Sequence, residues 1–173
     1  MKERLFIHDQ KVVEASLKNL QTVATTGYKS TEFIDPTTRL RWEKYPIGYN
    51  DDGDDEFGLR RLPYPTTEDL IHIAVTSDVV DEIEGAAMLL KDQEWNHLIE
   101  FREALLNAIE LHWKRIESER FSIIEGCTEL TSKGNRREIV GKSDAEIIAD
   151  ADYFRHLGQI ATELVSRLSA NKE

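Results

Sequence analysis

WEKYPIGYNDDGDDEFGLRRLPYP, residues Trp42–Pro65, is the stretch on which the prediction of the fold depends. It combines aromatic residues, prolines and glycines with five acidic side chains among the six residues Asp51–Glu56, whereas most of the chain has the apolar spacing of helices. Prolines and glycines at this density disfavour a long regular element. The sequence therefore predicts a mainly α protein interrupted over residues 31–65 by an irregular segment, with room for a short β-hairpin near residues 31–46.

The composition predicts a folded protein with a single domain spanning residues 1–173. Hydrophobic residues make up 40% of the chain and charged residues 32%, which is typical of globular proteins. The lone Cys127 excludes an intramolecular disulfide framework and a cysteine-based zinc site, and its apolar neighbours predict a buried thiol. The first residues contain no apolar run of the length found in signal peptides, and no run approaches the roughly 20 residues that span a bilayer. A cytoplasmic protein is therefore expected.

Periodic apolar residues predict five helices. Two of them have clear start signals: Thr66 precedes two acidic residues, and Ser143 and Glu146 have the spacing of a capping box. Residues 118–130 are compatible with either a continuing helix or a strand. The predicted helices are residues 9–24, 67–77, 79–92, 94–117 and 144–169.

The helices between Thr66 and His112 resemble the paired units of HEAT-like solenoids. Two short helices meet at Ser77 and Asp78, and a longer one follows. A solenoid needs several copies at a fixed period, and no second copy occurs in the sequence. The expected architecture is therefore a compact helical bundle or an irregular HEAT-like helical stack.

Two carboxylate–imidazole pairs have the spacing found in di-iron helical bundles. These pairs are Asp69 with His72 and Glu94 with His97. A di-iron site also requires two further inward glutamates, and the predicted apolar face places Glu100 on the opposite side of its helix. A metal-dependent helical-bundle enzyme thus remains an alternative, while helix capping and solvated surface are the favoured interpretation. We predict no enzyme activity, no catalytic residues, no cofactor and no metal.

The acidic run from Asn50 to Glu56 also suggests calcium. An EF-hand loop centred on Gly53 would place its first and last ligand positions on Gly48 and Leu59, which cannot ligate through side-chain oxygens. An irregular calcium site and a solvated loop balanced by neighbouring arginines both remain open.

A third interpretation is a protein-binding surface. Tyrosine, tryptophan and arginine are the usual anchors of protein interfaces, and several lie close to the acidic run. The same side chains would be ordinary core residues if they packed on the helices. The predicted partner-binding residues are Trp42, Tyr45, Tyr49, Asp51, Asp52, Asp54, Asp55, Glu56, Arg60, Arg61 and Tyr64.

The charge of the chain restricts the choice of partner. Its net charge is -11, which disfavours nucleic acid and favours a basic partner. Residues 78–117 alone carry 10 acidic and 4 basic side chains. The negative surface is therefore expected on the acidic loop and on the helices in the middle of the chain.

The chain resembles the immunity proteins of bacterial toxin systems, including those of contact-dependent growth inhibition and polymorphic toxins. The resemblance is one of overall character, carried chiefly by GLRRLPYPTTEDLIHIAVTSDVVDEIEGAAMLL, residues Gly58–Leu90, and it transfers no individual residue roles. It implies a protein that neutralises a cognate toxin, often a basic nuclease, by covering its active site. A non-catalytic adaptor inside the cell is the alternative binding role, and the oligomeric state stays open.

Overall fold

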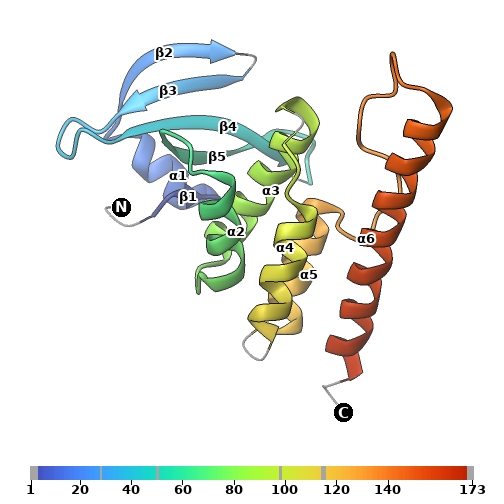
Figure 1. Ribbon diagram of the computed structural model, residues 1–173. Coiled ribbons are helices and arrows are strands. Elements are labelled where there is room, and N and C mark those ends of the chain that lie inside the picture. The colour runs from blue at the N-terminus through green and yellow to red at the C-terminus, as the bar shows by residue number, and fades with distance from the viewer. Residues whose placement is uncertain (1–3, 28, 50, 98, 114–115, 171–173) are drawn as a thin grey trace.

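The first third of the chain builds an antiparallel sheet, and the rest builds helices. The structure is a computed structural model that describes residues 4–27, 29–49, 51–97, 99–113 and 116–170, with only the backbone described at 26, 97, 169 and 170 (Figure 1). The elements are β1 Phe6–Ile7, α1 Gln10–Leu17, β2 Gln21–Gly27, β3 Ser30–Ile34, β4 Arg41–Tyr49, β5 Asp55–Leu62, α2 Thr67–Thr76, α3 Val80–His97, α4 Arg102–Leu111, α5 Ser118–Thr128 and α6 Asp144–Ala170.

The sheet corrects the predicted fold class. Its five strands lie in the order β1-β5-β4-β3-β2, and all neighbours are antiparallel, so the protein is mixed α/β rather than a mainly α bundle or a helical stack (Figure 1). A hairpin is present within residues 31–46, between β3 and β4. The predicted irregular segment is wrong, because β4 and β5 form the longest strand pair within it.

Prolines and glycines are tolerated in β4 and β5 for two reasons, a change of pairing in β4 and close packing in β5. The register between β4 and β5 shifts between Pro46 and Gly48, which is a β-bulge position. Gly58 is opposite Tyr45, and a Cβ atom there would lie 2.9 Å from the His8 ring. The glycine therefore allows close packing inside a regular strand instead of ending it.

One face of the sheet is covered by α1. Trp42 is 0% exposed in this small core, which also contains Ile7, Val13, Leu20 and Leu59. The predicted helix over residues 9–24 is wrong beyond Leu17, since residues 21–27 form β2. Those residues include β-branched threonines and Val23, which favour a strand over a helix.

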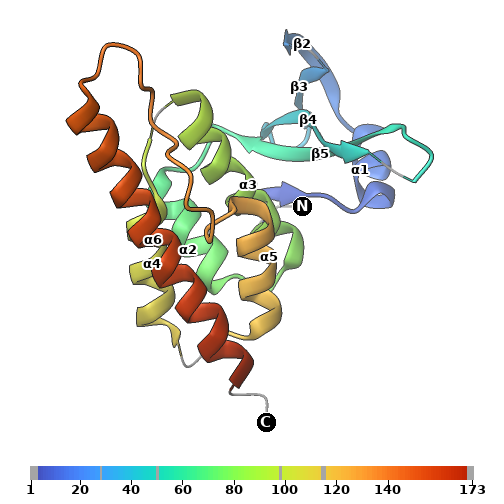
Figure 2. The same ribbon diagram turned by 90° about the vertical axis from the view of Figure 1, so that its right-hand side faces the viewer.

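The other face packs against the helices, and β1 connects the two cores. Phe6 lies in the large helical core and Ile7 in the small one, because successive strand residues point to opposite faces. The carboxylate of Glu82 in α3 accepts hydrogen bonds from the backbone amides of Leu5 (2.6 Å) and Phe6 (3.1 Å). Figure 2 shows β1 entering beside α3, with α5, α4 and α6 further from the sheet.

The helical predictions were accurate where local capping signals were strong. Thr66 forms a capping box with Asp69 at the start of α2, and Ser143 is bonded to Glu146 at the start of α6. Residues 118–130 are mostly helix, as α5. The predicted boundary at Glu94 is wrong, because α3 continues through this residue and the chain turns before α4.

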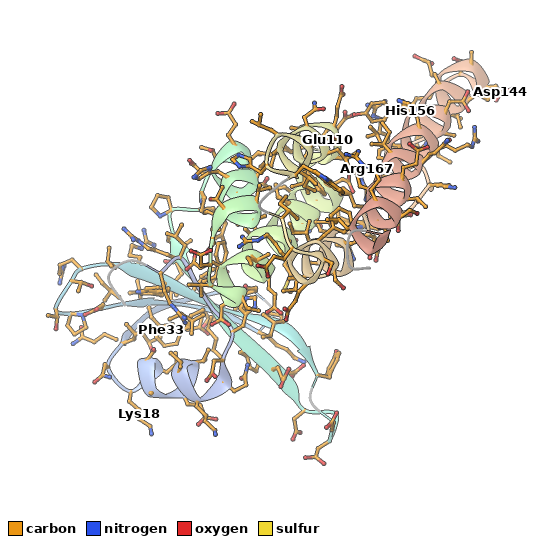
Figure 3. The ribbon with its side chains drawn as sticks, turned by 90° about the horizontal axis from the view of Figure 1, so that it is seen from below. Lys18, Phe33, Glu110, Asp144, His156 and Arg167 are labelled. Carbon is orange, nitrogen blue, oxygen red and sulfur yellow. The ribbon has the colours of Figure 1, made fainter. Side chains whose placement is uncertain are left out.

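The outer helices are joined by charged pairs as well as by apolar packing. Arg102 of α4 donates from Nε and Nη2 to Glu94 of α3 (2.7 and 2.9 Å), and its Nη1 donates to the Glu129 carbonyl (3.0 Å). Arg167 of α6 reaches Glu110 of α4 at 2.5 Å (Figure 3). In the described residues no helix combines the length and apolarity needed to cross a membrane.

The contact between β1 and α3 gives a stability prediction. A Cβ atom at Gly85 would lie 2.3–2.6 Å from atoms of Phe6, so Gly85→Ala is expected to lower the free energy of unfolding by about 1–3 kcal/mol through overpacking. Gly126, in α5, has open space around its Cβ position, so the control Gly126→Ala is expected to raise stability by up to about 1 kcal/mol. Urea unfolding measures both values, and equal effects of the two variants would contradict the proposed packing.

Candidate functional site

The β4–β5 hairpin separates the predicted partner-binding residues into an exposed tip and a packed base. Tyr49 is 72% exposed at the tip, and Asp51, Asp52 and Asp54 are exposed in the turn beyond it. Gly53 has φ +84°, a left-handed conformation that glycine adopts without strain. Figures 2 and 3 show the hairpin ending on the side of the molecule away from α6. We refer to residues 49 and 51–54 as the hairpin tip.

The first residues of β5 connect the tip to the sheet. Asp55 accepts a hydrogen bond from the Lys29 ammonium at 2.5 Å, beside the turn between β2 and β3. Glu56 is half-buried opposite Gly48. The acidity of the predicted loop is therefore partly compensated within the fold.

Arg60 is the centre of the hairpin base, the group that it forms with Glu43, Tyr45 and Tyr64. Its Nε donates to Glu43 at 2.8 Å, and its guanidinium carbon lies 4.5 Å from the Tyr45 ring centre and 4.6 Å from that of Tyr64. The Tyr64 hydroxyl also donates to Glu43. The arginine is thus held between two aromatic faces and one carboxylate, an arrangement that stabilises a cation at a partly buried site.

These contacts shift the titration of the groups around Arg60. Burial alone would raise the pKa of Glu43, but hydrogen bonds from Tyr64 and Arg60 outweigh it and lower that pKa. Burial and the hydrogen bond to Glu43 raise the pKa of Tyr64 to about 12. At neutral pH the site therefore contains a carboxylate, a guanidinium and a protonated phenol.

Tyr45 connects the hairpin base to β1 and α3. Its hydroxyl lies 2.6 Å from His8 Nε2, and His8 Nδ1 lies 3.2 Å from the Glu84 carboxylate. Burial raises the pKa of Tyr45. This carboxylate–imidazole–phenol sequence fixes the tyrosine ring against the sheet.

Two of the predicted residues lie on the opposite face of the sheet. Trp42 is fully buried in the core under α1, so its side chain is not accessible to a partner. Arg61 is paired with Trp42 across the strands, and its backbone amide donates to Leu5. Strand alternation separates both residues from Tyr45 and Arg60.

A cleft of about 550 Å³ lies between the hairpin and the helices α3 and α5. It brings Tyr45 and Arg60 together with residues that sequence reasoning had not assigned to a site, in particular Lys91, Trp95 and Cys127. Trp95 is 58% exposed. The cleft is lined by Tyr45, Pro46, Ile47, Arg60, Met88, Lys91, Asp92, Trp95, Asn96, Gly126 and Cys127.

The cysteine in this cleft is poorly suited to nucleophilic chemistry. Burial and the nearby charge of Glu84 raise the pKa of Cys127 to about 11. The thiol is therefore protonated at neutral pH, whereas the thiolate is the reactive form. Cys127 supplies a polarisable wall of the cleft.

The two carboxylate–imidazole pairs that were weighed as metal ligands include carboxylates with other contacts. Glu94 is bonded bidentately to Arg102, and Asp69 belongs to the cap of α2. The His97 side chain and Asn50 lie outside the described part of the structure. Within the described residues, no group of three or more His, Cys, Asp or Glu side chains is arranged to hold a metal ion.

The described surface thus offers an acidic, exposed hairpin tip and a cleft with cationic and aromatic walls. The sequence matches no protein-family model, no curated protein and no solved structure. Functional assignment therefore depends on the geometry of these two surfaces.

The ion pair at the hairpin base predicts a specific acid response. Because the folded pKa of Glu43 is lowered, its stabilising contribution is complete above the ordinary value of 4.5 and is lost as pH falls further. Glu43→Gln is expected to lower the free energy of unfolding by about 1–3 kcal/mol at neutral pH. Between about pH 5 and 3 the variant is expected to lose less stability than the wild type. The measurement is urea unfolding across that pH range.

Glu32→Gln is the matched control, because Glu32 pairs with the exposed Arg41 on the neighbouring strand. A surface pair of this kind contributes at most about 1 kcal/mol. Parallel pH profiles for the wild type and Glu43→Gln would show that the pair does not govern the acid response.

Proposed function

We propose that this protein is a non-catalytic immunity protein that binds and neutralises a cognate bacterial toxin domain, a basic domain of nuclease type. The observation that carries this proposal is the hairpin tip, where Tyr49 and three aspartates are exposed at the end of a strand pair. A nuclease must present cationic side chains to phosphates. Carboxylates at the end of a projecting hairpin can occupy such a surface and exclude the nucleic acid.

The hairpin base supports this role by limiting the freedom of the strands that present the tip. Arg60, Glu43 and Tyr64 connect β4, β5 and the segment before α2. A binding element that is already ordered loses less conformational entropy on association. The aspartates can then supply long-range attraction, while Tyr49 supplies an aromatic anchor.

The charge of the whole molecule is consistent with a basic partner. A net charge of -11 raises the encounter rate with a cationic surface and disfavours nucleic acid as a direct ligand. The acids of the middle helices contribute less than their number implies, because Asp81, Glu82 and Glu94 are bonded within the fold. The tip is therefore the acidic element best placed for contact. A cytoplasmic location belongs to the same proposal.

The class of partner is tested by co-expression with the product of the neighbouring gene. We expect a stoichiometric complex after affinity purification, and loss of the partner's toxicity when this chain is present. A partner that remains toxic in the complex, or that fails to co-purify, would contradict the proposed function.

The contribution of the tip is tested by neutralising its charge. The triple variant Asp51→Asn, Asp52→Asn, Asp54→Asn is expected to slow association with that partner by at least about tenfold at low salt, because electrostatic steering is lost. The difference in association rate between the variant and the wild type should decrease at higher salt, because salt screens the electrostatic attraction. Stopped-flow or surface-plasmon measurements across a salt series give these rates.

The control variant removes the same charge from the other end of the molecule. Asp144→Asn, Glu119→Gln, Glu163→Gln changes exposed residues of α5 and α6, and Figure 3 shows Asp144 far from the hairpin. We expect a much smaller effect on association. Equal slowing by both triple variants would indicate that net charge, and not the tip, determines the rate.

A further inference from the structure

The cleft beside the hairpin base has features of a ligand site that the toxin-binding proposal does not use. It lies between β4–β5 on one side and α3 with α5 on the other, and its volume of about 550 Å³ is within the usual range for small-molecule sites. Two cations, Arg60 and Lys91, line it together with the aromatic rings of Tyr45 and Trp95. Two cations in one cleft are unexpected in a chain with net charge -11.

Arg60 is held in place with part of its hydrogen-bonding capacity unused. Nε donates to Glu43 and Nη2 to Tyr64, at 2.8 and 3.2 Å. Among the described residues, Nη1 has no hydrogen-bond partner. The two tyrosine rings on either side restrict the guanidinium, so this donor is preorganised.

Lys91 is positioned by the end of α5. Its ammonium donates to Glu129 at 2.7 Å, and the same carboxylate also accepts from Arg136. The single negative charge of Glu129 is therefore shared between Lys91 and Arg136, and it neutralises their positive charge only partly. Lys91 also has two further N–H donors for a ligand.

Trp95 supplies an aromatic wall at the mouth of the cleft. Its ring is largely exposed, and the Arg136 guanidinium lies 5.0 Å from the ring centre. The remaining wall includes Met88 and Ile47, which are apolar. Asp92 is the acid that lines the cleft, and its carboxylate accepts from the Asn96 amide at 2.5 Å.

We propose that the cleft binds a small planar aromatic anion, in which a carboxylate or phosphate group lies between Arg60 and Lys91 and the ring packs against Trp95. A carboxylate and a phosphate offer the same acceptor chemistry to these cations. The apolar walls and the aromatic ring favour a planar body. This ligand is separate from the proposed protein partner, whose docking element is the hairpin tip.

The first test uses the fluorescent probe 1-anilinonaphthalene-8-sulfonate, which combines a planar naphthalene ring with an anionic sulfonate. Titration into the full chain is expected to show saturable binding at a stoichiometry of one. The uncharged analogue N-phenyl-1-naphthylamine is expected to bind at least tenfold more weakly. Equal binding of the two probes would overturn the anionic part of the proposal, and the absence of saturable binding would overturn the site.

A variant that fills the cleft separates this site from unspecific apolar binding. Gly126 lines the cleft and has nothing within 4 Å of its Cβ position, so Gly126→Leu places an apolar side chain in the cavity without disturbing the helix. We expect this variant to lose probe binding, while Gly126→Ala retains it. Retained binding in Gly126→Leu would contradict the location. Far-UV circular dichroism and urea unfolding verify that both variants are folded.

Two further substitutions test the roles of the walls. Lys91→Gln and Trp95→Ala change partly or largely exposed side chains, and each is expected to weaken probe binding at least fivefold. Lys11→Gln, on the exposed side of α1, is the charge-matched control and should leave binding unchanged. If Lys11→Gln weakens binding as much as Lys91→Gln, the attraction is unspecific.

The anionic group is then identified by competition. Displacement of the probe by 1-naphthoate indicates a carboxylate site, and stronger displacement by 1-naphthyl phosphate indicates a phosphate site. Displacement by neither compound would overturn the assigned ligand class. None of these outcomes depends on the toxin partner, so failure of the ligand site and failure of the immunity function can be distinguished.

Discussion

The two-residue strand β1 is the constraint on which the rest of the structure depends. Phe6 and Ile7 point to opposite faces, so this short segment enters both hydrophobic cores. Its backbone pairs with β5, while carboxylates at the start of α3 accept from the amides around it: Glu82 from Phe6 at 3.1 Å and Asp81 from His8 at 3.0 Å. A two-residue strand has little stability of its own, and these helix carboxylates replace the longer ladder that it lacks.

The position of β1 also determines the geometry of the cleft. His8 follows β1 directly, and its ring is hydrogen-bonded to the Tyr45 hydroxyl. The depth to which Phe6 packs against Gly85 therefore determines where the Tyr45 ring lies in the wall of the cleft. Arg60 is paired with Phe6 across β1 and β5, with its guanidinium against the same tyrosine. The large core, the hairpin base and the cleft are therefore one packed unit. A change at Gly85 would be transmitted to the cleft through ordinary side-chain contacts.

Local signals in the sequence predicted the helices whose stability begins locally. The caps at Thr66 and Ser143 are formed by residues three positions apart, and both were recognisable. The sheet was not predicted because successive side chains of Trp42–Pro65 point to two faces that are both buried. Charged and aromatic residues therefore occur at positions where solvent-facing residues are expected. Glu43 is buried because Arg60 is opposite it in the hairpin, and only the strand register specifies that pair. Similarly, Lys91, Trp95 and Cys127 meet Tyr45 through packing of α3 and α5, which no spacing along the chain indicates.

The β-bulge in β4 determines how the two surfaces are related. Tyr45 and Pro46 line the cleft before the register shift between Pro46 and Gly48, Ile47 lines it within the shift, and the exposed Tyr49 follows the shift. On the cleft side of the bulge, Arg60 and the rings of Tyr45 and Tyr64 hold the hairpin in place. On the tip side, the ion pair between Lys29 and Asp55 connects the hairpin to the neighbouring strands. A bulge bends and twists a strand locally, so the tip and the groups around Arg60 lie on differently oriented parts of the hairpin. One hairpin therefore has exposed carboxylates at its end and Arg60 near its base, where Lys91 of α3 lines the same cleft.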